Sequence, residues 1–237
     1  MTTLFQSLPN FFAALDRKLE KETRNHLKNV YGSMVVALAA ATAGAYVHLY
    51  TSLLSGGLLS SLGTFGLIMA LYSTPHTKEN YTKRMGYLAG VGFCSGLSLG
   101  PLLEVAMFIN PSLVLTALSC TAIIFASFSL SAIFADQGKW LYLGGLLSSA
   151  LSMLFWMSLL NLFFGSRLIF QANLYMGLFV MSGFVMYDTT LIIEKHRRGD
   201  DDFISHAVMV FIDFISIFKH VLVILMQKEE RQSRRRK

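Results

Sequence analysis

Charged residues are scarce in this sequence: they make up 14% of its 237 residues, whereas a soluble globular domain carries about 25%. Hydrophobic residues make up 54%, and the mean hydropathy of +0.52 leaves too little polar surface to cover a soluble domain. The composition therefore excludes a soluble enzyme and indicates a membrane protein.

Cysteine is almost absent. Cys94 and Cys120 both lie inside apolar runs, so they build neither a disulfide framework nor a zinc cluster. The net charge of +6 comes from basic residues between and after the apolar runs, so we expect topology signals and no nucleic-acid partner. The N-terminal stretch lacks the apolar core and cleavage site of a signal peptide.

Six apolar runs are long enough to cross a bilayer, since a core of about 30 Å needs about 20 helical residues. They cover residues 30–50, 53–72, 86–108, 113–134, 140–160 and 169–187. A seventh run, residues 203–226, contains charged groups that are costly at membrane depth unless they face protein or water. We therefore predict an all-α, multi-pass membrane bundle of six transmembrane helices plus a seventh, inner or re-entrant helix.

The connections between these runs are short, which predicts one membrane bundle over residues 30–226. Residues 1–29 form a basic N-terminal segment that either lies on the membrane as an interfacial helix or packs as a cytosolic arm. The basic tail, residues 227–237, would emerge opposite the other basic loops after seven crossings. Either the last run re-enters or packing overrides charge, and we expect both termini to be cytosolic.

Glycine recurs at every fourth position in the third run, at Gly92, Gly96 and Gly100. Lipid tails are as apolar as leucine side chains, so membrane helices associate where small residues let their backbones approach. We expect this glycine face to pack against a neighbouring helix.

Two aspartates, Asp188 and Asp213, are expected to lie level on the last two helices, because the midpoint between them falls beside the turn at Gly199. Two carboxylates at one height in a low dielectric do not both ionise cheaply, so they are expected to share a proton. Such a pair is a pH-sensitive latch. When the pair loses its protons, the two carboxylates repel each other or bind a cation. Calcium is the suitable cation because it accepts hard carboxylate oxygens.

Further polar groups are accessory candidates. His206, Asp213 and His220 recur at intervals of seven on the last run, with Lys219 near the same face. Glu104 follows Pro101 by one turn and either has a function or reaches the membrane interface. The alternative interpretation is that the aspartates are only buried, hydrogen-bonded structural residues.

Several segments resemble the Bax inhibitor family, the transmembrane Bax-inhibitor-motif proteins, and most closely its founding endoplasmic-reticulum member. They are residues 183–194 (GFVMYDTTLIIE), 211–218 (FIDFISIF), 26–31 (HLKNVY), 43–48 (AGAYVH), 97–101 (LSLGP) and 170–175 (FQANLY). The resemblance extends over nearly the whole chain.

The resemblance implies an endoplasmic-reticulum membrane protein that leaks calcium, suppresses apoptosis and modulates the unfolded-protein response. It also implies that Asp188 and Asp213 form the pH sensor of the leak, with calcium as the permeant or bound ion and no other cofactor. Bcl-2-type regulators and the stress-sensing kinase of the unfolded-protein response are the implied partners. Bacterial relatives close the pair with an arginine in the second helix, but residues 53–72 contain none, so Lys219 and His220 are the nominated substitutes.

Two other functions remain open. A non-conducting membrane module that binds cell-death regulators fits the same resemblance, and the sequence leaves open whether the chain forms a homo-oligomer. An intramembrane aspartyl protease would use Tyr187 and Asp188, but Asp213 lacks the preceding glycines that let a substrate backbone approach. We therefore expect no enzyme.

Overall fold

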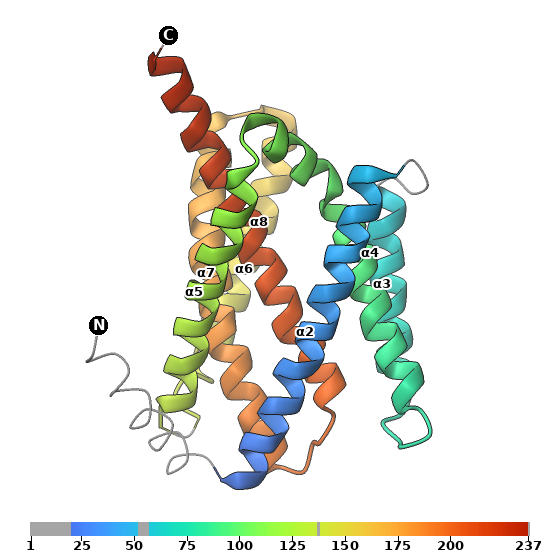
Figure 1. The fold of residues 1–237 in the computed structure, drawn as a ribbon. Helices are drawn as coiled ribbons and strands as arrows, with labels where there is room; N and C mark the ends of the chain where they lie inside the picture. The colour runs from blue at the N-terminus through green and yellow to red at the C-terminus, as the bar shows by residue number, and fades with distance from the viewer. Residues whose placement is uncertain (1–19, 52–56, 137, 237) are drawn as a thin grey trace, which may run out of the picture.

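The computed structural model describes residues 20–51, 57–136 and 138–236, and this part of the chain is a bundle of helices without a strand (Figure 1). The helices are α2 (Lys21–Tyr50), α3 (Leu58–Ser73), α4 (Tyr81–Ile109), α5 (Ser112–Phe134), α6 (Leu143–Phe164), α7 (Arg167–Arg197) and α8 (Phe203–Arg236). Successive helices run in opposite directions. The prediction of an all-α bundle is confirmed.

Six helices are long and apolar enough to cross a membrane, but they are not the six expected. The last helix is among them, with a candidate span over Phe203–Arg234, whereas α3 has only 16 residues, or about 24 Å. The described helix in this region, α3, is therefore shorter than the expected crossing over residues 53–72. Helix α3 begins only after Gly57, whose amide donates to Ser60 Oγ, and the start of the expected run falls among the undescribed residues 52–56.

Helix α8 is the inner helix of the bundle. It packs against α2, α4, α5 and α7, and its buried apolar side chains include Ile204, Phe211, Ile217 and Leu222. Its 34 residues form one continuous helix that is long enough to cross a membrane. Burial by its neighbours is what allows this helix to carry Asp213.

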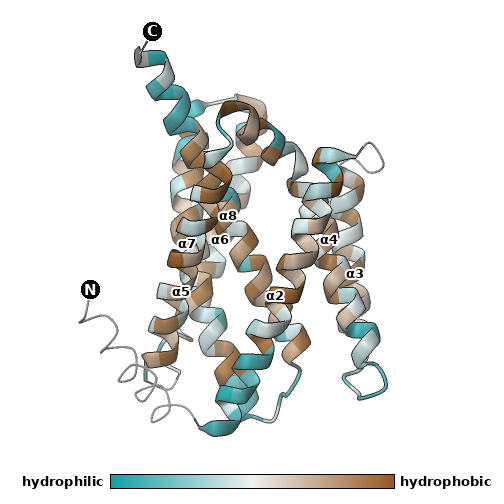
Figure 2. Ribbon diagram, in the orientation of Figure 1, coloured by the Kyte–Doolittle hydropathy of each residue, from teal (hydrophilic) through white to brown (hydrophobic). Residues whose placement is uncertain are grey.

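The beginning of α2 and the end of α8 lie at opposite ends of the bundle (Figure 1). The described part of the chain therefore runs from one end of the bundle to the other. Figure 2 shows hydrophilic residues gathered where α2 begins and where α8 ends, with hydrophobic residues between. The cytosolic location of both termini stays a prediction, and most of the expected interfacial helix falls in the undescribed residues 1–19.

The predicted glycine packing is confirmed, and the partner is α2. A Cβ atom on Gly96 would overlap the carbonyl oxygen of Ala41, and one on Gly92 would overlap that of Ala37. Gly44 of α2 is equally close to the backbone of Phe93 in α4. The two backbones therefore touch, and only glycine fits at these positions.

Candidate functional site

Asp188 of α7 and Asp213 of α8 lie together inside the bundle. Their exposed fractions are 9% and 5%, and their side chains are close neighbours at the contact between α7 and α8. The two antiparallel helices meet at a turn in which Gly199 has a φ of 92°, a conformation suited to glycine. Each aspartate is about 14–15 Å from the turn end of its helix, so the two side chains lie level.

A hydrogen bond between two such neighbouring carboxyl groups would require a proton. An ionised carboxylate only accepts hydrogen bonds, so one of the two groups must be protonated to donate. Asp213 Oδ2 has no hydrogen-bond partner among the described residues, although it is buried. Two neighbouring buried carboxyl groups favour a shared proton, since loss of that proton would leave adjacent negative charges.

A cluster of three hydroxyl groups borders the aspartate pair. Tyr31 Oη hydrogen-bonds to Ser129 Oγ and lies 3.5 Å from Thr189 Oγ1, and the Ser129 and Thr189 oxygens are 3.3 Å apart. Thr189 directly follows Asp188, and Tyr31 interacts electrostatically with Asp213. The cluster joins α2, α5 and α7 beside the carboxyl groups, and the sequence analysis missed it.

The accessory candidates do not gather around the pair. Glu104 is exposed, and its Oε2 lies 3.9 Å from His48 Nε2. Lys219 is also exposed. His220 Nδ1 donates to the carbonyl of Ser216 at 2.7 Å, with its ring against Gly177 of α7.

His206 is separated from Asp213 by about two helical turns, at the end of the bundle. Its Nδ1 lies 2.9 Å from His26 Nε2 of α2. The seven-residue spacing of the polar residues on α8 therefore marks several separate environments along one helix rather than one polar pathway.

Arg84 of α4 fixes the connection between α7 and α8. The residue is 1% exposed, and its guanidinium donates to Asp202 Oδ2 at 2.5 Å, to Ser205 Oγ at 2.8 Å and to His76 Nδ1 at 2.8 Å. Arg84 is one of the basic residues between the expected apolar runs, and the expectation that these residues only signal topology was incomplete for it. Its contacts tie α4 to the hairpin that carries the aspartate pair.

Asp202 lies in the connection, outside the helices. Burial alone raises the pKa of its carboxyl group, but hydrogen bonds from Arg84 and Ser205 and the Arg84 charge outweigh this effect. The net result is a pKa below the ordinary aspartate value. Asp202 is therefore held as a carboxylate by its partners in the fold.

Comparisons with known proteins agree with the resemblance in sequence. The family model described as "Inhibitor of apoptosis-promoting Bax1" matches residues 23–230. Bax inhibitor 1 of Rattus norvegicus is 48% identical over 235 residues and that of Homo sapiens 47% identical over 235 residues, each match covering 99% of both chains. Bax inhibitor 1 of Arabidopsis thaliana is 39% identical over 224 residues, which cover 94% of this chain and 87% of the relative.

Proposed function

Because this chain belongs to the Bax inhibitor family of apoptosis-suppressing membrane proteins, we propose that it resides in the endoplasmic reticulum and mediates a pH-sensitive calcium leak. The proposed sensor of the leak is the pair Asp188 and Asp213. The location follows the resemblance to the founding member of the family. The single observation that carries the mechanism is the burial of these two carboxyl groups beside each other.

The proposed gate works by the change in charge of the pair. With one proton held between them, the carboxyl groups attract each other and keep α7 and α8 together. When the proton is lost, two carboxylates in a buried environment repel each other unless a cation neutralises them. The helices then separate or admit an ion, so the leak responds to pH.

Calcium suits this site because it takes hard oxygen ligands. The pair supplies carboxylate oxygens, and calcium completes its six to eight ligands with water and carbonyl groups. The hydroxyl groups of Tyr31, Ser129 and Thr189 add polar surface on one side of the pair. In this proposal calcium is the permeant or transiently bound ion and not a permanent part of the protein.

Modulation of the unfolded-protein response is part of the same proposal. A change in luminal calcium links the leak to cell death and to protein folding in that compartment. Bcl-2-type regulators and the stress-sensing kinase of the unfolded-protein response are the proposed protein partners. These contacts would be made within or beside the lipid bilayer.

The test is calcium efflux from liposomes that contain only this purified protein, measured across a pH series. The proposal expects efflux above that of empty liposomes and a rate that changes with pH. Liposomes that lose calcium no faster than empty ones, at every pH, would overturn the leak. That result would favour the non-conducting interaction module.

A further inference from the structure

A groove lies between α2 and α5, with α8 as its floor. Both α2 and α5 pack against α8. The groove is lined by residues between 35 and 50 of α2, Leu103 of α4, Leu118 of α5, and Phe214 and Phe218 of α8. Its volume is about 530 Å³, and the exposed side chains of Val35 and Leu118 show that it opens outward. This space is called the lateral groove below.

The lateral groove faces lipid. The helices that line it, α2, α4, α5 and α8, are all long and apolar enough to cross a membrane. Along α2 the groove covers residues 35–50, which span about 22 Å at 1.5 Å per residue. One leaflet contributes about 15 Å of the hydrocarbon core of a bilayer. The groove is therefore long enough to hold the acyl chain of a lipid from one leaflet.

The polar groups that line the lateral groove are unevenly placed. Thr42 Oγ1 donates to the carbonyl of Leu38 at 2.9 Å, so its hydroxyl group is satisfied within α2. In the described part of the chain, the other polar side chains of the lining are Tyr46 and Tyr50. Their rings are 4.8 Å apart at the end of α2, and both are more than half exposed. Tyrosine is typical of the membrane interface, so the groove has an apolar body and one polar end.

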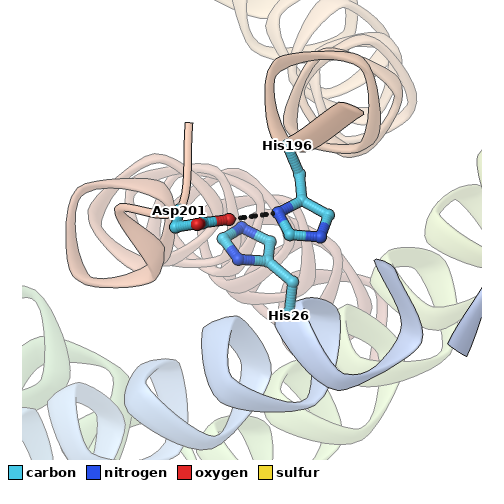
Figure 3. A group of neighbouring side chains, drawn as sticks. All are labelled: His26, His196 and Asp201. Atoms are coloured by element: carbon cyan, nitrogen blue, oxygen red, sulfur yellow. Dashed lines mark ion pairs between the residues drawn. The ribbon is translucent and has the colours of Figure 1, made fainter. Parts of the chain in front are cut away.

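The opposite end of the groove is located by counting from the end of the bundle where α2 and α8 begin. There His26 of α2 lies beside His196 and Asp201 (Figure 3), and its Nε2 is 2.9 Å from His206 Nδ1 of α8. Both helices begin at this end and run in the same direction. The contact therefore sets residue 26 of α2 level with residue 206 of α8.

Phe214 and Phe218 form the floor of the groove at its deep end. They lie about 12 and 18 Å beyond His206 along α8, whereas Tyr46 lies about 30 Å beyond His26 along α2. The two phenylalanines are 7% and 6% exposed, so lipid that only surrounds the bundle does not reach them. An acyl chain whose polar end stays near the tyrosines would bring its tail against these two rings.

We propose that the lateral groove binds one acyl chain of a glycerophospholipid, with the polar end of the lipid beside Tyr46 and Tyr50. Moving an acyl chain from the bilayer into the groove gains little hydrophobic free energy, because both environments are apolar. Binding depends instead on close packing against α8 and on hydrogen bonds from the tyrosine hydroxyl groups to ester or phosphate oxygens of the lipid. The proposal is independent of the role of the aspartate pair.

The size of the groove favours an acyl chain over a helix of a partner or of a second copy. A helix is about 10 Å wide, so a piece about 22 Å long occupies about 1,700 Å³. The groove holds about 530 Å³, which is too small to admit such a helix down to the floor. A single hydrocarbon chain is thin enough to enter.

The test is photolabelling of the full chain in phosphatidylcholine vesicles. A small share of the lipid carries a diazirine near the end of one acyl chain, which loses nitrogen in light and inserts as a carbene into nearby C–H bonds. We expect labels on Phe214 and Phe218, and also on Leu115, which is 69% exposed on α5 outside the groove. Labels on Leu115 without labels on the two phenylalanines would overturn the proposal.

The orientation of the lipid is tested with a second probe. A phosphatidylcholine with its diazirine next to the ester group should label Tyr46 or Tyr50 and leave Phe214 and Phe218 almost unlabelled. Equal labelling of the two phenylalanines by both probes would contradict the proposed position of the polar end.

Two tryptophan variants test whether the labels depend on the groove. Thr42→Trp fills the middle of the groove, whereas the matched control Ala43→Trp points about 100° away around α2 and lies outside the lining. Both positions are exposed, so both variants should fold. We expect Thr42→Trp to lower the labelling of Phe214 and Phe218, relative to Leu115, by about threefold or more, since the large ring takes the place of the chain. Ala43→Trp should label like the parent, and equal labelling of the phenylalanines in both variants would overturn the proposal.

Discussion

The guanidinium of Arg84 and the carboxylate of Asp202 form a charge pair at 2.5 Å that joins the start of α4 to the connection between α7 and α8. Arg84 is almost fully buried, and the Asp202 side chain is 20% exposed. The pair therefore fixes the base of the hairpin on which Asp188 and Asp213 meet. Any movement of that hairpin therefore occurs relative to the position fixed by this ion pair.

Asp202→Asn should destabilise the protein. The substitution leaves the buried Arg84 charge without its carboxylate, and a hydrogen bond to a charged group contributes about 1.5–3 kcal/mol. We expect a lower melting temperature in detergent by several degrees. The control is Glu79→Gln, an exposed acidic residue near the same end of α4, which should melt like the parent. Equal melting temperatures for Asp202→Asn and the control would show that the ion pair of Arg84 and Asp202 contributes nothing to stability.

The same pair predicts how stability depends on acid. Because the pKa of Asp202 is lower in the folded protein, its stabilisation is fully present above the unfolded value of about 3.9. It is lost as the pH falls through the lower, folded pKa. Melting curves at a series of acidic pH values should therefore bring parent and Asp202→Asn together at the acid end. A gap that stays constant down to the lowest pH would contradict this.

Gly96→Ala should disrupt the contact of α2 with α4. The added Cβ atom overlaps the carbonyl oxygen of Ala41, and backbone atoms cannot move aside without separating the helices. We expect a lower folded yield and a lower melting temperature, with a larger effect for Gly96→Leu. Gly86→Ala is the matched control on the same helix, because a Cβ atom there has no neighbour within 4 Å. Identical behaviour of the two alanine variants would refute the packing assignment.

The side of the membrane on which the basic tail lies is tested by thiol labelling. Six basic residues after residue 227 predict a cytosolic C-terminus, since each can gain about 1 kcal/mol near an anionic leaflet. A cysteine placed after Lys237, with Cys94 and Cys120 replaced by serine, should then react with an impermeant reagent in sealed microsomes. Labelling only after the membrane is opened would contradict this and place the C-terminus in the lumen.

The bundle and the aspartate pair could be predicted because both depend on local patterns. Apolar run length indicates helices, and counting from the turn at Gly199 places Asp188 and Asp213 level on two consecutive helices. The length of α3 could not be predicted, because hydropathy does not show where the helix begins near Gly57.

Contacts between segments far apart in the sequence were not predictable in the same way. Arg84 meets Asp202, and His26 meets His196 and His206, across more than 100 residues. These contacts depend on how the helices tilt and pack, which no local sequence pattern encodes. The hydroxyl group of Tyr31 beside the aspartate pair was missed for the same reason.

The most direct test of the proposed gate is the pH profile of calcium efflux from liposomes containing Asp213→Asn. An asparagine cannot lose the proton that the pair holds, so the gate should no longer respond to pH. We predict that the parent and the control Glu79→Gln show efflux that changes with pH, whereas Asp213→Asn shows the same efflux at every pH. An Asp213→Asn profile that follows the parent across the series would contradict the proposed role of the pair.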